Sequence, residues 1–189
     1  MATHTLIALV EDKPGVLNRV ASLFRRRGFN IESLAVGHCE SPGLSRMTIA
    51  VNGTAAAVEQ VRKQLEKLID VVKVSDITED SLIARELALL KVKTTPATRG
   101  EIIQIVDIFR ASIVDVASDS LVVEVTGDED KVDSLLRLLK GYGVKEVART
   151  GRIAMTRGSA GPIVTEGDTA RHREPRPKKA KYINDISNL

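Results

Sequence analysis

The sequence predicts an α+β protein made of two similar units and a C-terminal tail. Along the chain, the spacing of apolar residues switches between the period of two that is typical of strands and the 3.6-residue period of helices. The order of these switches is strand, helix, strand, strand, helix, strand, and it occurs twice. Beyond about residue 156 this periodicity stops, and Gly, Pro, Thr and charged residues dominate. Residues 156–189 are therefore expected to form a flexible tail.

The first unit is predicted from four strand-like and two helix-like segments. Strands are expected at 5–10, 31–38, 46–51 and 71–77. The apolar residues at helical spacing are Val16, Val20, Leu23 and Phe24 for a helix over 16–27, and Val58, Val61, Leu65 and Leu68 for a second helix. Pro14-Gly15 suits the two central positions of a tight turn before the first helix. Gly28 follows that helix where a C-cap glycine is expected.

The second unit repeats this order with little residue identity to the first. Strands are expected at 85–94, 111–118, 120–126 and 144–150, the last of these closing the unit. The helical apolar sets are Ile102, Ile105, Val106 and Phe109, then Val132, Leu135, Leu136 and Leu139. Thr98, with Glu101 three residues later, has the spacing of a capping box at the start of the first of these helices.

Both units suit a ferredoxin-like arrangement, in which two helices cover one face of a four-stranded antiparallel sheet. The expected domains are residues 4–77 and 84–155, followed by the tail at 156–189. Units of 70–80 residues have small cores. Each sheet would leave one face and two edges uncovered, and such edges favour pairing with a second copy.

The charge distribution argues against a nucleic-acid binder. The net charge of +3 is carried by residues 156–189, which hold seven Lys and Arg against four acids, while residues 1–155 hold 21 of each sign. RNA-binding sheets of this topology stack bases on exposed aromatic residues. The strands TLIALV and RMTIAV carry none. The folded part therefore offers neither a basic surplus nor a stacking platform.

A cytoplasmic protein without catalytic chemistry of its own is expected. The single cysteine, Cys39, excludes an intramolecular disulfide, and the sequence has neither a signal peptide nor an apolar run of membrane-spanning length. The histidines show no metal-ligand spacing. His38 and Cys39 are neighbours on a predicted strand and point to opposite faces, so they do not form a nucleophile pair.

The segment that connects the first strand to the first helix has the features of an amino-acid site. A helix N-terminus presents free N–H groups and a partial positive charge, which suit a carboxylate. Gly15 lets a ligand approach the backbone, and Asp12 can accept a hydrogen bond from an ammonium group. An ordinary turn before a helix is the alternative reading of the same residues.

Several segments together resemble one family. "DKPGVL" at 12–17, "RGFNIESLAVG" at 27–37 and "LSRMTIAV" at 44–51 resemble the amino-terminal ACT domain of acetolactate synthase small subunits. "VVKVSDIT" at 71–78, "RELALLKV" at 85–92, "IFRASIVDVA" at 108–117 and "KEVARTGRIAMTRG" at 145–158 resemble later parts of the same family. The resemblance covers about 155 residues and excludes the tail.

The resemblance implies a regulatory subunit of acetolactate synthase that activates a large catalytic subunit and confers feedback inhibition by valine. Thiamine diphosphate, magnesium and FAD would belong to the large subunit, and this chain would hold no cofactor or metal. Valine would bind between the ACT domains of a homodimer. The implied effector-binding residues are Asp12, Pro14, Gly15, Val16 and Leu17 of one chain with Asn30 and Ile31 of its partner.

One alternative function and one structural expectation remain. A stand-alone ACT amino-acid sensor that regulates another enzyme would share the Asp12–Leu17 loop. The narrower "NIESLAVG" segment at 30–37 favours the small subunit over that alternative. Arg46, on the third predicted strand, is expected to pair with Glu32 across the hairpin.

Overall fold

The computed structural model describes residues 2–158 and confirms the α+β class with two ferredoxin-like units. The predicted tail lies outside the described residues, apart from its first three. The first unit contains β1 (Ala2–Glu11), α1 (Val16–Arg26), β2 (Ile31–His38), β3 (Leu44–Gly53), α2 (Ala55–Leu65) and β4 (Val71–Asp76). The second contains β5 (Leu82–Lys93), α3 (Arg99–Ile108), β6 (Ser112–Val116), β7 (Ser120–Gly127), α4 (Glu129–Leu139), the 3-10 turn η1 (Lys140–Tyr142), β8 (Val144–Arg149) and β9 (Ile153–Thr156).

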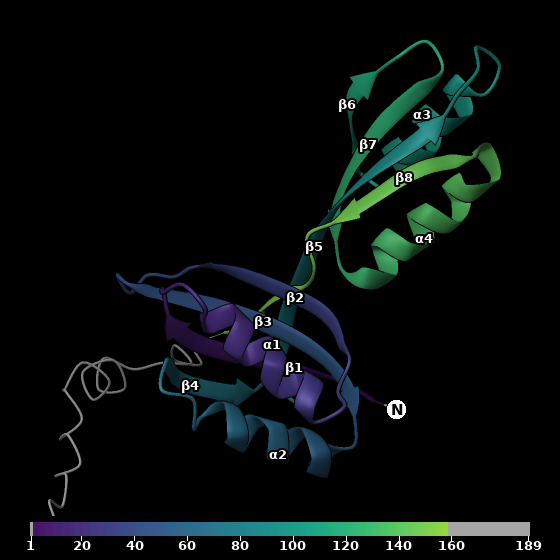
Figure 1. Cartoon of the computed structure of the whole chain (residues 1–189). Helices are drawn as coiled ribbons and strands as arrows, with labels where there is room; N and C mark the ends of the chain where they lie inside the picture. The colour runs from purple at the N-terminus through teal and green to yellow at the C-terminus, as the bar shows by residue number, and fades with distance from the viewer. Residues whose placement is uncertain (1, 159–189) are drawn as a thin grey trace, which may run out of the picture.

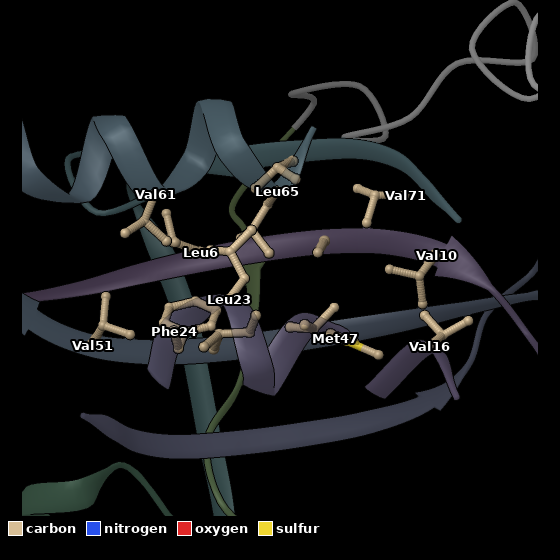
Figure 2. Close-up of a cluster of buried hydrophobic side chains, with 14 of the residues drawn as sticks. Leu6, Val10, Val16, Leu23, Phe24, Met47, Val51, Val61, Leu65 and Val71 are labelled. Atoms are coloured by element: carbon tan, nitrogen blue, oxygen red, sulfur yellow. The ribbon is translucent and has the colours of Figure 1, made fainter. Parts of the chain in front are cut away.

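The first unit is one antiparallel sheet with both helices on the same face (Figure 1). The strand order is β2-β3-β1-β4, so β2 and β4 are the edges. Alternate side chains of the central strand β1, such as Leu6 and Val10, face the helices and meet Phe24 of α1 and Leu65 of α2. Figure 2 shows this aliphatic cluster, in which Phe24 is the one aromatic ring that is fully buried.

Two glycines fix the limits of α1. Gly15 has φ +86° and ψ −9°, and the Val16 N–H donates to Lys13 O at 3.4 Å, which is the geometry of a type II turn with Pro14 and Gly15 at its centre. At the other end, Gly28 has φ +71°. The N–H groups of Gly28 and Phe29 donate to Arg25 O and Phe24 O, both at 3.1 Å, and form a Schellman motif. Both sequence predictions for this helix are therefore confirmed.

The second unit has the strand order β6-β7-β5-β8, again with both helices on one face. Ala88, Leu90 and Val92 of β5 contribute to a core that is almost entirely aliphatic. The predicted capping box at α3 is wrong. The Thr98 side chain makes no cap hydrogen bond with the helix, because it bonds with Thr95, and Glu101 accepts instead from the Tyr142 hydroxyl at 3.2 Å.

Strand β9 was not predicted, and it changes the surroundings of the first sheet. The chain turns after β8, and β9 pairs antiparallel with the first four residues of β5. Leu82, Ala84 and Ala154 of this β5–β9 ribbon pack against Ile7 and Ile77 of the first unit. The expectation of an uncovered face is therefore wrong for the first sheet, since a ribbon from the second unit covers part of it.

Polar contacts hold the ribbon on the first sheet. The Arg46 guanidinium donates to Ala154 O at 2.8 Å. The predicted Arg46–Glu32 pair is wrong, because Arg46 lies opposite Gly37 in the ladder and Glu32 accepts from the Asn30 side chain at 3.0 Å. In the turn before β9, the Arg152 N–H donates to Ser33 Oγ at 2.7 Å. The two units are therefore joined through apolar packing and through direct hydrogen bonds.

The first testable consequence concerns the core of the first unit. Phe24→Ala is expected to lower the free energy of unfolding of this unit by about 3–5 kcal/mol, because the ring is 1% exposed and its loss leaves a cavity. The matched control is Ile69→Ala, at a side chain that is 60% exposed, with an expected change of about 0.5 kcal/mol or less. Urea denaturation followed by circular dichroism measures both. Equal effects of the two substitutions would contradict the packing described.

Candidate functional site

The segment Asp12–Leu17, which joins β1 to the first turn of α1 and is called the loop below, contains five of the seven predicted site residues. The type II turn brings the start of α1 directly behind Asp12, and no side chain caps this helix. Its first turn also holds no acidic residue, so the N–H groups at its start are not neutralised by a neighbouring carboxylate. The geometry can accept a small anion at the helix N-terminus.

The side chains of this loop divide into buried and accessible ones. Val16 is 4% exposed and belongs to the hydrophobic core, so only its backbone can contact a ligand. Leu17 is 45% exposed and is the accessible apolar side chain of the loop. Pro14 and Gly15 are also exposed, and a Cβ placed on Gly15 would meet no atom within 4 Å. The approach to the Gly15 backbone is therefore open.

Asp12 is held by residues from two other strands. Its Oδ1 accepts from the Ser45 hydroxyl at 3.4 Å, and its Oδ2 lies 3.4 Å from His38 Nδ1. The Asp12 N–H donates to Gly43 O at 2.9 Å. His38 ends β2 and Ser45 lies near the start of β3, so both reach Asp12 only because the strands pair. Sequence reasoning missed these two neighbours, although the register of β1 against β3 would have indicated Ser45.

The nearest cationic side chains already have partners. Lys13 Nζ lies 2.7 Å from Glu11 Oε2, and Arg19 forms an ion pair with the nearly buried Asp70. These ion pairs reduce the positive charge that Lys13 and Arg19 can offer a ligand. An anion in this loop would therefore be bound mainly by backbone N–H groups.

Asn30 and Ile31 lie at the opposite end of the sheet. Ile31 of β2 pairs with Val51 of β3, and Val51 pairs with His4 of β1. Asp12 directly follows Glu11, which lies seven residues beyond His4 along β1. At about 3.3 Å per residue, these seven residues alone separate the two parts of the predicted site by about 23 Å along the strand direction. One chain therefore does not bring all seven residues together. Asn30 is exposed and directly precedes the edge strand β2, and Ile31 is half-buried at the first position of that strand.

His38 and Cys39 are not in a nucleophile–base arrangement. His38 faces Asp12, while the Cys39 thiol donates weakly to Leu44 O at 3.5 Å and Ser41 O at 3.8 Å. Over residues 2–158, no group of three His, Cys, Asp or Glu side chains could hold a metal ion. No helix in this part of the chain is long and apolar enough to cross a membrane.

A cavity of about 420 Å³ lies beside β2, on the sheet face that the β5–β9 ribbon covers. One wall is formed by Ala35–His38 of β2 and the other by Ile83, Ile153 and Met155 of the ribbon. Arg46 also lines the cavity, and burial lowers the pKa of its guanidinium, partly offset by Glu40 and Cys39. Most of the lining is aliphatic.

Each of the two units matches the model of a known protein family. The model of the AHAS small subunit-like ACT domain matches residues 6–73. The model of the small subunit of acetolactate synthase matches residues 85–158.

Individual relatives agree with these matches. The chain is 61% identical over 156 residues to a "probable acetolactate synthase small subunit" of Archaeoglobus fulgidus, covering 82% of this chain and 98% of that one. It is 54% identical over 159 residues to the acetolactate synthase small subunit of Mycolicibacterium smegmatis, covering 84% and 94%. The crystal structure of the small subunit from Thermotoga maritima superposes with a TM-score of 0.78 at 45% identity, covering 84% and 99%.

The site geometry makes a prediction about Gly15. Gly15→Ala is expected to lower the free energy of unfolding by about 1 kcal/mol, because a side chain at φ +86° is strained even where space is open. Gly37→Ala is the control, since Gly37 has no positive φ and its added Cβ would also meet nothing within 4 Å. Equilibrium urea unfolding of both variants tests this. A Gly15→Ala protein as stable as Gly37→Ala would argue against the type II turn.

Proposed function

Because this chain belongs to the family of acetolactate synthase small subunits, we propose that it binds the large catalytic subunit, raises its activity and lets valine reverse that effect. The first unit is an ACT domain. The observation that carries the proposed feedback role is the open, uncapped N-terminus of α1 directly behind Asp12.

Valine matches the chemistry of this loop. Its carboxylate would accept hydrogen bonds from the N–H groups at the start of α1, where the helix dipole favours negative charge. Its ammonium group would donate to Asp12, and its isopropyl group would contact Leu17. Val36 is also accessible at 47%, and it lies opposite the core residue Met47, on the same side of β2 as α1. The loop thus supplies partners for each group of the ligand.

A homodimer formed through β2 would complete the site. β2 is an edge of its sheet, and its outer N–H and C=O groups can pair with the same strand of a second copy. In an antiparallel pair related by a two-fold axis, the start of one β2 lies beside the end of the other. The partner's Asn30 and Ile31 would then lie near His38 and Asp12 of this chain. This arrangement accounts for the separation of about 23 Å within one chain.

The proposal makes the chain a regulator rather than a catalyst. Thiamine diphosphate, magnesium and FAD would be held by the large subunit, and both proteins would act in the cytoplasm. Feedback requires that valine binds the inhibited and activated assemblies with different affinities. The coupling is reciprocal, so the large subunit must weaken or strengthen valine binding by the same factor.

The proposal predicts that the purified chain alone forms no acetolactate from pyruvate, even with thiamine diphosphate, magnesium and FAD present. The same protein added to its large subunit should raise the specific activity. A colorimetric assay for acetolactate measures both. Turnover by a preparation shown by mass spectrometry to lack large subunit would disprove the regulatory assignment.

The site predicts that Gly15→Asp abolishes valine inhibition of the reconstituted holoenzyme. The added carboxylate would occupy the open approach to the Gly15 backbone and repel the carboxylate of valine from the helix N-terminus. Activation measured without valine should stay near the level of the unsubstituted protein. Asn30→Ala is expected to weaken inhibition less, by an amount on the order of 1–3 kcal/mol if Asn30 is buried in the dimer.

The control for backbone strain is Gly15→Ala, which has the same φ requirement but no added charge. It should retain most of the valine response. Inhibition that is unchanged in Gly15→Asp would remove valine from this loop. Equal loss of activation and inhibition in Gly15→Asp, with both intact in Gly15→Ala, would assign the loop to contact with the large subunit.

A further inference from the structure

His38 lies against the carboxylate that the proposed function assigns to the ammonium group of valine. Its Nδ1 is 3.4 Å from Asp12 Oδ2. The imidazole ends β2 opposite Ser45, and since alternate residues of a strand share a face, it lies on the same side of the sheet as Val36 and α1. His38 is therefore part of the candidate site, although the proposed function gives it no role there.

The two oxygens of Asp12 have different neighbours. Oδ1 accepts from the Ser45 hydroxyl at 3.4 Å, while Oδ2 faces the imidazole of His38. The His38 side chain is 84% exposed and that of Asp12 is 48% exposed, so solvent and a ligand can reach this contact. A ligand that donates to Oδ2 therefore meets the imidazole at the same oxygen.

The charge of His38 decides whether it competes with a ligand for Asp12. Histidine is the side chain that ordinarily changes charge between pH 5 and 8. A neutral imidazole leaves the Asp12 carboxylate free to pair with an ammonium group. An imidazolium pairs with that carboxylate itself and repels a second cation. Free valine stays zwitterionic throughout this range, so the change arises in the protein.

The other charged groups near His38 belong to residue types that ordinarily keep their charge in this range. They are Glu11 and Lys13, which pair with each other, Glu40 in the hairpin loop after β2, Arg46 of β3, Arg85 of β5 and, in the proposed homodimer, the partner's Glu32. The Cys39 thiol next to His38 donates weakly to Leu44 O and Ser41 O. Carboxylates, guanidinium groups and lysine ammonium groups ordinarily carry the same charge at about pH 6 and about pH 7.5. A change in valine affinity between these two values is therefore assigned to His38.

We propose that His38 is a further residue of the effector site, and that its protonation weakens valine binding because the imidazolium competes with the ammonium group of valine for Asp12. The inference rests on the proposed function and adds a pH dependence to it. The coupling is reciprocal, so bound valine drives the proton off His38. Feedback inhibition then becomes weaker as the surroundings of the protein acidify.

The test is isothermal titration calorimetry of valine into the full-length chain at about pH 6 and about pH 7.5, on either side of the ordinary histidine transition. The dissociation constant is expected to be about two- to four-fold higher at the lower pH, which is the range for a partly exposed ion pair. Titrations in buffers of different ionisation enthalpy should show a net release of protons on binding at the lower pH.

Two substitutions at the same exposed position are the matched controls. His38→Gln should bind valine with the same dissociation constant at both pH values and without proton release. His38→Lys keeps a positive charge at both values, so it should bind valine more weakly than His38→Gln at both. His4, which lies 3.6 Å from Asp76, is unchanged in both variants, so a pH effect from His4 would persist in them. Circular dichroism checks that both variants fold.

The outcomes separate this inference from the proposed function. Equal affinity at both pH values in the unsubstituted chain, or a pH dependence that persists in His38→Gln, would overturn the inference and leave the proposed valine site in place. Tighter binding at the lower pH would overturn it as well, because the imidazolium would then bind the carboxylate of valine. No valine binding at either pH would refute the proposed effector site and this inference with it.

Discussion

The structure depends on one constraint, which is the alternation of side chains along β5. Over its twelve residues this strand first belongs to a two-stranded ribbon and then becomes a central strand of the second sheet. Its even-numbered side chains meet the first unit at Ala84 and the helices of the second unit from Ala88 onward. Because the alternation is not interrupted, the contact with the first unit and the core of the second unit lie on the same side of one strand. Figure 1 shows this long strand passing between the units.

Much of the fold could be predicted from local patterns in the sequence. The type II turn at Pro14-Gly15 and the Schellman motif at Gly28 depend on backbone conformations that glycine adopts readily, and such signals act within four or five residues. The apolar periodicity that predicts the amphipathic helices is also a local signal. The capping box at Thr98 failed because a neighbouring threonine, Thr95, competed for the same hydroxyl.

The features that sequence reasoning missed all arise from pairing between distant segments. Strand β9 has only four residues, too few to show a period, and it exists because β5 pairs with it across about 70 residues of chain. Arg46 was assigned to Glu32 from the proximity of their strands, yet its partner is the carbonyl of Ala154. In the candidate site, the loop itself was predictable, whereas the contacts of Asp12 with His38 and Ser45 required the register of three strands.

The late position of β9 in the sequence has a consequence for synthesis. The first sheet is complete once Asp76 has been made, but the ribbon that covers Ile7 and Ile77 also needs residues 153–156, about 80 residues later. At roughly 5–20 residues per second, a ribosome takes on the order of 4–16 s to add them. During that interval an unpaired β5 segment with Leu82 and Ala84 is the only part of the ribbon available to cover this apolar patch, and a chaperone would have most to bind in this period.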